Sequence, residues 1–228
     1  MNSKYSNILT IILIVIIVLI IAILGFLGYK YYTNVVLKNN AEDFVESFVG
    51  DTEKNNNKDK EDNTDNDIDS DWSSGVQEGD STASDYNPSA NAPKYQGFYI
   101  SGTIEIPAIN IKYPVIAQYE YSKSSLEKSV VEIYGPGLNQ EGNTTIAGHN
   151  YRNGTFFSNN KKLNIGDKIY ITDLTGKRLS YTIYDKYEVP DTEAAFMTRD
   201  TQGAIEISLS TCTDDVSARL IILAKADV

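Results

Sequence analysis

The chain has very little cysteine and histidine: Cys212 is its only cysteine and His149 its only histidine among 228 residues. A single cysteine excludes an intramolecular disulfide, so the fold must be stable without one. One histidine and one cysteine also fall short of the usual zinc ligand set. If the chain uses a cysteine nucleophile assisted by a histidine, only this pair can supply it.

Basic stripes and internal repeats are missing as well. Residues 92–228 carry 14 basic and 16 acidic side chains, so this stretch is nearly neutral. With no basic stripe and no run of stacking aromatic residues, we do not expect a nucleic-acid partner. The carboxylates Glu120, Glu127 and Glu132 match no metal-binding spacing, and we predict no metal site.

A long apolar run is present at residues 8–28, broken only by Thr10. Its length suits a helix that crosses a bilayer. It is too long for a typical signal-peptide core, and no small-x-small cleavage site follows it. We therefore predict an uncleaved transmembrane anchor at 8–28, preceded by a short terminus at 1–7.

Residues 29–91 are predicted to connect this anchor to a folded domain. Within them, residues 39–50 favour a short helix capped by Asn40, as an extension of the anchor. From Asp51 to Asp85 the chain has twelve acidic residues against three lysines. Such a tract buries too little apolar surface to fold, and self-repulsion extends it. We predict a disordered acidic linker in which Trp72 is solvated, with docking of Trp72 on the domain as the alternative.

Residues 92–228 consist mainly of short alternating runs separated by turn signals, which is typical of strands. So many strands imply an all-β sandwich or barrel. Ser124 and Glu127 form a possible capping box for one short helix that runs through Val131. The strands are expected at 97–106, 109–116, 144–147, 168–172, 179–187, 204–211 and 219–224.

Cys212 ends one of these expected strands. Ile205, Ile207 and Leu209 alternate with polar residues, which indicates a strand with one apolar face. Cys212 has the parity of the polar residues, so its thiol is predicted to point away from that apolar face. The alternative is a buried structural cysteine, because a free cysteine is one of the most often buried residue types.

His149 and Arg219 are the other candidates for chemistry. A nearby imidazole or cation is what turns a thiol into a useful thiolate. Arg219 follows Cys212 by seven residues, and its permanently charged guanidinium suits an oxyanion or a substrate carbonyl. The alternatives are a loop-capping histidine and a strand-end arginine on a solvated face.

These residues lie in segments that resemble a known family. SLSTC followed by Arg219 resembles the TLxTC-to-Arg signature of the sortases, and TTIAGHN resembles their histidine segment. Ser208 stands where that family usually has threonine. Gly102 to Ile116 is similar to the family's first strand pair, and Phe156 to Tyr170 to the segment after the histidine. The resemblance covers roughly residues 95–227.

The resemblance implies that residues 92–228 form an eight-stranded sortase-type β-barrel with a few short helices. This barrel would be a monomeric catalytic domain on the external side of a Gram-positive cell membrane. The short N-terminus would be cytoplasmic, whereas the lysines that flank the anchor hardly decide its orientation. Sortases that polymerise pilins often carry a lid anchored by Asp-Pro-aromatic. Asp71 and Trp72 lack the proline, so that lid-bearing type is disfavoured. No cofactor is implied, although some sortases use calcium.

The resemblance also implies a mechanism, that of a cysteine transpeptidase. The Cys212 thiolate attacks the Thr-Gly carbonyl of an LPXTG-like sorting signal on a surface protein, and Arg219 stabilises the oxyanion. His149 protonates the departing amine. An amine from a peptidoglycan precursor then resolves the thioacyl enzyme.

The expected substrate contacts are Ala147, Thr211 and the stretch from Asp185 to Thr198. Papain-like peptidases place Cys before His, the reverse of this order. L,D-transpeptidases place the two almost side by side, whereas positions 149 and 212 differ by 63. A membrane-tethered, non-enzymatic β-domain that binds wall components stays open as a further alternative, as do the exact sorting motif, the acceptor and the subclass.

Overall fold

The computed structural model describes residues 3–58 and 92–228, which divide into two compact units, Met1–Asn40 and Ala41–Val228. Most of the predicted acidic linker, including Trp72, lies outside the described residues. The described residues of the first unit are helical, and the second unit holds the barrel.

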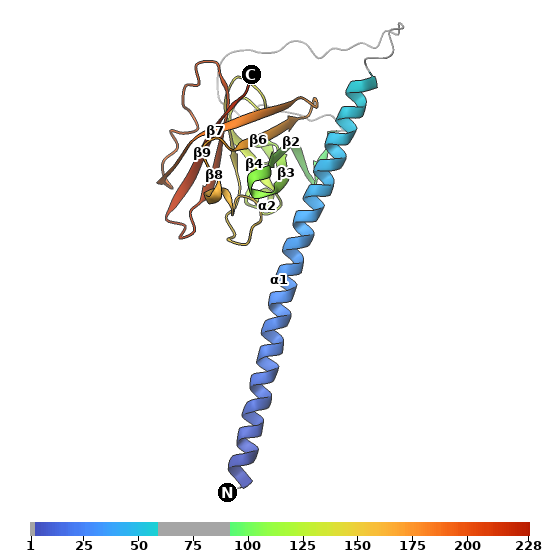
Figure 1. Cartoon of the computed structure of the whole chain (residues 1–228), viewed down its shortest axis with the longest axis vertical. Coiled ribbons are helices and arrows are strands. Elements are labelled where there is room, and N and C mark those ends of the chain that lie inside the picture. Colours follow the sequence, from blue (N-terminus) through green and yellow to red (C-terminus); the bar gives the residue numbers. More distant parts are fainter. Residues whose placement is uncertain (1–2, 59–91) are drawn as a thin grey trace. The chain divides into compact units, whose positions relative to one another are not determined.

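Helix α1 (Ser3–Lys58) is a single uninterrupted helix (Figure 1). Its stretch Leu9–Gly50 is long and apolar enough to cross a membrane, and its most apolar window has a mean hydropathy of 3.5 with no residue buried. Large apolar side chains from Leu9 to Leu27 are exposed to their surroundings. Such a surface is favourable in hydrocarbon and unfavourable in water.

Residues 39–50 are helical and extend the anchor helix as predicted, but the predicted cap at Asn40 and the predicted end at residue 50 are wrong. α1 passes through Asn40 without a break and continues to Lys58, because no proline interrupts the chain before residue 88. Part of this continuation has a packed face: Ala41 and Val45 are buried within the second unit. The first eight residues of the predicted disordered tract, 51–58, are therefore helical.

The second unit is built on one nine-stranded sheet with the order β1-β2-β3-β4-β5-β8-β9-β7-β6. β6 pairs again with β2, so strands β2 to β9 form a closed eight-stranded barrel, which confirms the predicted fold. Closure leaves no open edge between these strands. The elements are β1 (Lys94–Tyr95), β2 (Phe98–Ile106), the 3₁₀ helix η1 (Pro107–Ile109), β3 (Ile111–Ile116), η2 (Gln118–Glu120), α2 (Lys123–Leu126), β4 (Val130–Tyr134), β5 (Gly142–Ala147), η3 (Asn160–Lys162), β6 (Lys168–Asp173), β7 (Arg178–Pro190), β8 (Ile205–Cys212) and β9 (Ala218–Ala226).

The short helix before β4 differs from its prediction. α2 is capped by Ser122, whose side chain and backbone form the reciprocal capping box with Ser125, not by the pair Ser124 and Glu127. The helix also stops before Val131, because Val130 and Val131 pair in parallel with β3. β-branched residues pack well in a pleated strand, and this pairing overrides the weak local helix signal.

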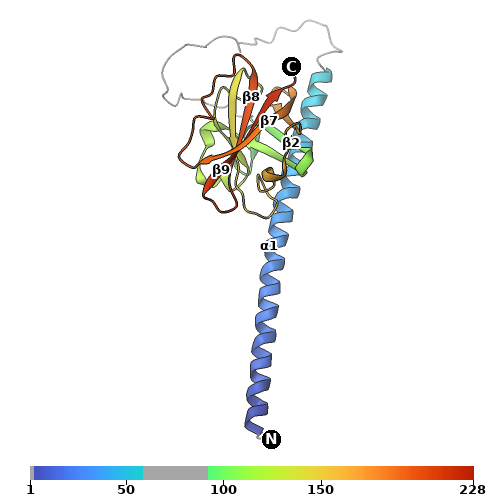
Figure 2. The ribbon, with the colours of Figure 1, turned by 60° about the vertical axis from the view of Figure 1, so that its left-hand side comes forward.

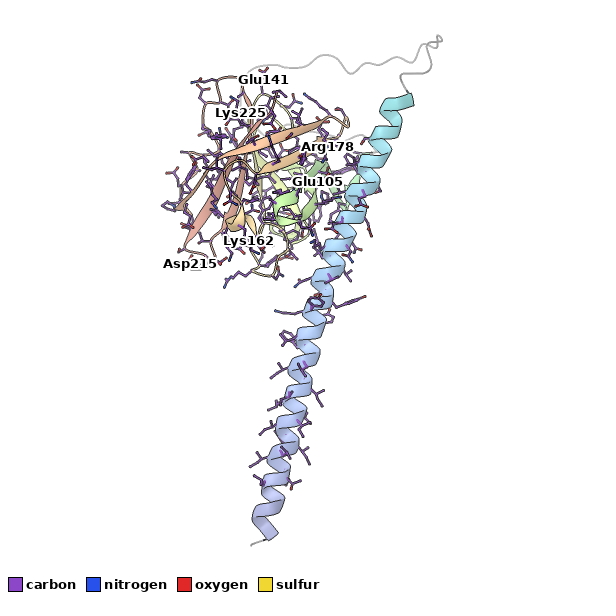
Figure 3. All side chains as sticks on the ribbon, viewed as in Figure 1. Glu105, Glu141, Lys162, Arg178, Asp215 and Lys225 are labelled. Atoms are coloured by element: carbon purple, nitrogen blue, oxygen red, sulfur yellow. The ribbon has the colours of Figure 1, made fainter. Side chains whose placement is uncertain are left out.

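An ion pair between Arg178 and Glu105 lies over the pairing of β2 with β6 that closes the barrel. Arg178 Nη1 lies 2.6 Å from Glu105 Oε1, and Figure 3 labels both side chains. The Arg178 guanidinium also lies over the ring of Tyr170, 4.7 Å from its centroid. These contacts tie β7 across β6 to β2, on a partly exposed surface where such pairs contribute modestly to stability.

Glu132 is a lone buried carboxyl on β4, with 4% of its surface exposed. Burial raises its pKa to about 7, and a hydrogen bond with Ser101 opposes that rise only partly. The folded state therefore holds a proton that the unfolded chain releases above its ordinary pKa of 4.5. Folding stability must fall as pH rises from about 4.5 to about 7, because the folded state binds more protons in this window.

We expect Glu132→Gln, which keeps the shape without the charge, to remove most of this pH dependence. At pH 8 the variant should be more stable than the wild type by up to about 3 kcal/mol, and at pH 4 the two should be similar. Urea unfolding at both pH values measures this difference. A wild type whose stability rises between pH 4.5 and pH 7, with the variant following it in parallel, would show that Glu132 is ionised in the fold.

Candidate active site

Strand order brings the three predicted catalytic residues to one end of the barrel. β8 lies between β5 and β9, and Figure 2 shows β7, β8 and β9 running along one wall. β5 and β8 pair in parallel, so His149, two residues beyond β5, and Cys212, the last residue of β8, lie at the same end. The antiparallel pairing of β8 with β9 places Cys212 opposite Arg219.

All three side chains line one cavity of about 360 Å³. Its other walls come from the chain after β3, from β4, from the end of β5 and from the β7–β8 segment, which we define as residues 191–204. A cavity of this size accommodates a few side chains of an extended peptide. The remaining lining residues are Tyr121, Leu126, Ile133, Ala147, Gly148, Asp191, Glu193, Ala194, Phe196, Met197 and Ser210.

Cys212 is a free, half-buried thiol in this cavity. Arg219 Nη1 lies 3.8 Å from its sulfur. The guanidinium keeps further N–H donors for an oxygen that approaches the sulfur. Ser210 lines the same cavity, as its shared parity with Cys212 along β8 predicts.

His149 lines the same cavity from the loop after β5 and is partly buried. Burial lowers the pKa of His149 below its ordinary value; the charge of Glu127 acts against this shift, and Lys123 adds to it. The imidazole ring also faces the ring of Tyr151, with 4.8 Å between centroids. This ring contact and the burial together restrict where the imidazole can point.

Gly148 sets the backbone just before His149. Its N–H donates to Ser210 O at 3.1 Å, and its carbonyl accepts from the hydroxyl of Thr211 at 2.7 Å. A Cβ on Gly148 would lie 2.8 Å from the ring of Phe157, so a larger residue would push the histidine loop off the barrel. These contacts fix His149 relative to the end of β8.

The two predicted substrate contacts have different surroundings. Ala147 lines the cavity that holds His149 and Cys212. Thr211 is buried, with 2% of its surface exposed, and its hydroxyl is engaged with Gly148. Thr211 lines a second cavity, of about 390 Å³, which also reaches Cys212. The Thr211 hydroxyl therefore joins β8 to the loop that carries His149.

Asn150 is a site residue that the sequence argument missed. Its Nδ2 donates to Cys212 O at 3.0 Å and to Asp214 Oδ1 at 2.9 Å, so it joins the histidine loop to the end of β8. Lys161 and Asn150 both donate to Asp214 and lower the pKa of its carboxyl. The only sequence signal for Asn150 was its place directly after His149.

The carboxylates considered for calcium have separate surroundings. Glu120 accepts a hydrogen bond from the backbone N–H of Tyr99 at 3.3 Å, and Glu132 is buried next to Ser101. Within residues 3–58 and 92–228, no group of three or more His, Cys, Asp or Glu side chains is placed to hold a metal ion.

The barrel is similar to those of several solved structures. A sortase D5 transpeptidase from Clostridium perfringens superposes with a TM-score of 0.52 at 25% identity, over 57% of this chain and 80% of that one. A sortase C from the same organism, solved with the C-terminal cell wall sorting motif, gives 0.50 at 25% identity, over 57% and 71%. The fold is therefore the sortase barrel.

Sequence comparison agrees with this fold. The Sortase domain family matches residues 104–227, more than half of the chain. Sortase A of Bacillus anthracis is 31% identical over 138 residues, which cover 54% of this chain and 58% of that relative's length. The chain belongs to the sortase family. Its relatives include sortases of classes A, C and D, so the comparisons identify the family but not the subclass of this chain.

Proposed function

We propose that this chain is a membrane-anchored cysteine transpeptidase that cleaves an LPXTG-like sorting signal and transfers the protein to a cell-wall amine. The observation that carries the proposal is the cavity in which Cys212, His149 and Arg219 meet, with the guanidinium 3.8 Å from the thiol sulfur. These are the groups that acyl transfer needs: a nucleophile, a donor for the oxyanion and a proton carrier.

In the first step, the Cys212 thiolate attacks the carbonyl carbon of the scissile Thr-Gly bond. The carbonyl oxygen becomes an oxyanion, which Arg219 stabilises through its N–H donors. His149 gives its proton to the nitrogen of the departing glycine, and the C–N bond breaks. The products of this step are a thioester on Cys212 and a free amine.

In the second step, an amine from a peptidoglycan precursor attacks the thioester. Neutral His149 accepts the proton of that amine, and the C–S bond breaks to restore the thiolate. The net reaction exchanges one amide bond for another and consumes no cofactor. A water molecule in place of the amine would give hydrolysis.

The reactive form needs Cys212 without its proton and His149 with one. Burial lowers the pKa of His149, so the imidazolium is a minor form at neutral pH. We therefore propose that the form with a protonated His149 and a Cys212 thiolate is a minor population at neutral pH, unlike the dominant ion pair of papain-like sites.

Support for the substrate class comes from the relative that was solved with a sorting motif, and support for the location comes from α1. An exposed helix of this hydropathy would anchor the chain in the membrane, with the barrel on the external side. The sorting-signal proteins and the wall precursor are its proposed partners.

The experiment is to incubate the full chain in detergent micelles with a panel of sorting peptides, with and without an oligoglycine or diamine acceptor. The proposal predicts cleavage after threonine for at least one peptide and a new amide product when the acceptor is present. Mass spectrometry identifies both products. No cleavage of any peptide by a chain whose thiol is reactive would favour a binding domain over an enzyme.

A further inference from the structure

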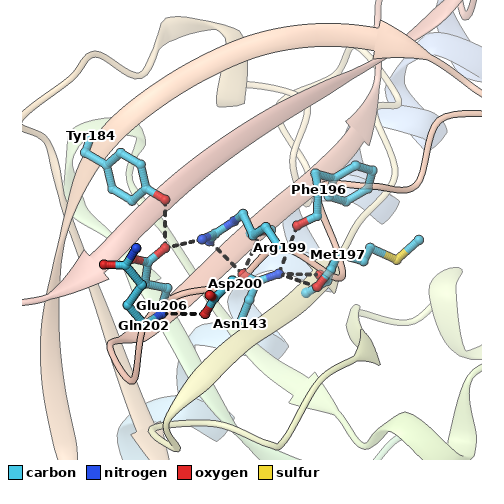
Figure 4. Close-up of polar contacts among 10 residues, drawn as sticks. Asn143, Tyr184, Phe196, Met197, Arg199, Asp200, Gln202 and Glu206 are labelled. Carbon is cyan, nitrogen blue, oxygen red and sulfur yellow. Dashed lines mark hydrogen bonds and ion pairs between the residues drawn. The ribbon is translucent and has the colours of Figure 1, made fainter.

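Asn143, on β5, holds the β7–β8 segment by two main-chain contacts. Its Nδ2 donates to Phe196 O at 3.1 Å and to Met197 O at 2.9 Å (Figure 4). Asn143 is buried, with 5% of its surface exposed. Two carbonyls of an irregular segment, far away in sequence, thus depend on one buried amide for their hydrogen bonds.

The orientation of this amide is fixed from its other side. Asn143 Oδ1 accepts from Arg199 Nη2 and from Ser208 Oγ, each at 2.8 Å. Arg199 is an ion-pair partner of Glu206, which also accepts from the hydroxyl of Tyr184 at 2.7 Å. Arg199 faces the amide oxygen with a donor that cannot accept, and the carbonyls of Phe196 and Met197 face the NH₂, so a flipped amide would lose these three hydrogen bonds.

The segment that Asn143 holds belongs to the Cys212 cavity, while Asn143 itself does not. Phe196 and Met197 line the cavity with Cys212. Asn143 and Arg199 line a neighbouring cavity of about 440 Å³, which shares Met197 with the first. The polar contacts therefore lie behind the wall that a substrate in the Cys212 cavity would touch.

Apolar packing holds the same segment from one more direction. Phe196 forms a buried cluster with Ile221 and Leu223 of β9, and Met197 packs against this cluster. This packing holds the Phe196 side chain against β9. The main chain at Phe196 and Met197 is held by the hydrogen bonds that their carbonyls accept. Asn143 supplies those contacts.

We propose that Asn143, oriented by Arg199 and Ser208, is a positioning residue that sets the β7–β8 segment in the shape that binds the sorting signal. This inference rests on the transpeptidase function proposed above. It assigns a role to Ser208, since a hydroxyl at this position orients the amide that holds the substrate wall. Asn143 touches no reacting atom, so its loss should weaken peptide binding more than it slows the chemistry.

The test is Asn143→Asp in the full chain, in detergent micelles. The new carboxylate keeps its contacts with Arg199 and Ser208 but faces the carbonyls of Phe196 and Met197 with an acceptor in place of a donor. The segment should be released while the ion pair behind it stays intact. Ser208→Ala, which removes one orienting donor, provides a second variant should Asn143→Asp fail to fold.

Asn139→Asp is the matched control. Asn139 is also a buried amide, and its Nδ2 donates to Asp173 Oδ2 at 3.1 Å and to Lys177 O at 2.8 Å. Its positive φ of 61° is tolerated by aspartate. The control makes the same substitution at a buried site away from the β7–β8 segment. The new carboxylate there faces the Asp173 carboxylate as well as a carbonyl, so the control tests a loss of stability at least as severe.

Hydrogen exchange gives a readout that needs no substrate. The amides of Met197 and Thr198 donate to Ala194 O and Ala195 O within the segment, at 2.9 and 3.3 Å. In Asn143→Asp these amides should exchange about tenfold faster than in the wild type, while in Asn139→Asp they should exchange at the wild-type rate. Equal exchange at these amides in both variants would overturn the proposal.

Kinetics gives the second readout. For Asn143→Asp, KM for the sorting peptide should rise about fivefold or more with kcat within about twofold, and Asn139→Asp should change neither by more than about twofold. An unchanged KM, or a loss in kcat that the control shares, would overturn the positioning role. If the wild type itself cleaves no peptide, the proposed function fails, and hydrogen exchange still decides whether Asn143 holds the segment.

Discussion

Replacing Cys212 with alanine is expected to abolish both cleavage and transfer while the fold stays intact. Without the thiol no thioester can form, and the rate should fall by on the order of 10⁴-fold or more, to the background of uncatalysed hydrolysis. The side chain is half-buried at the end of β8 and lines a cavity, so its removal leaves the barrel core unchanged.

The measurement compares peptide turnover with circular dichroism and thermal melting of the same preparation. Wild-type-like spectra and melting with no turnover are the expected combination. Substantial residual transfer by Cys212→Ala would mean that another group is the nucleophile. A collapsed fold would return Cys212 to the structural interpretation.

The second large effect is expected for Arg219→Lys, which keeps the positive charge but loses the planar fork of donors. If Arg219 directs N–H groups at the oxyanion, loss of one such interaction raises the barrier by about 2.7 to 4 kcal/mol, or roughly a hundredfold or more in kcat. Arg219 already lies 3.8 Å from the thiol sulfur, on the strand position opposite Cys212.

Arg178→Lys is the control for this substitution. Arg178 lies on the barrel surface, where it pairs with Glu105, and it does not line the Cys212 cavity. Arg178→Lys is therefore the same substitution away from the site. This variant should turn over peptide at nearly the wild-type rate. Near-wild-type turnover by Arg219→Lys as well would make Arg219 a structural residue.

Much of the barrel follows from local sequence pattern. Alternation over 204–211 predicts β8 because each second residue there, Ile205, Ile207 and Leu209, faces one side of the sheet. The segments of β2, β6 and β7 follow in the same way. The order of the strands and the closure between β2 and β6 depend on contacts between distant residues, which local pattern does not contain. The family resemblance implies an eight-stranded barrel and no more than that.

The errors have local causes. Ser124 and Glu127 fit a capping-box pattern, but Ser122 and Ser125 form the actual capping box, and the helix that they cap is one turn long. Val131 was assigned to a helix because nothing in the sequence shows that β3 lies beside it. Pairing with a distant strand decides such short apolar segments, and a local pattern does not contain this information.

The polar positions of β8 show a further limit of pattern. Glu206, Ser208 and Ser210 alternate with apolar residues as they would on a solvated face, yet all three are buried. They lie beneath the β7–β8 segment, where Glu206 and Ser208 belong to the network around Asn143. Alternation reports that a face is polar, and it does not report whether water or another segment covers that face.

The central claim is that Cys212 forms a thioester with a sorting signal, and intact-mass spectrometry of the chain tests it most directly. After a short incubation with a cleavable peptide and no amine acceptor, the account predicts an adduct whose added mass equals that of the peptide fragment ending in threonine less one water. The adduct should map to Cys212, disappear with hydroxylamine and be absent from Cys212→Ala. No adduct with any sorting peptide, from a folded chain whose Cys212 is still alkylated by iodoacetamide, would contradict the account.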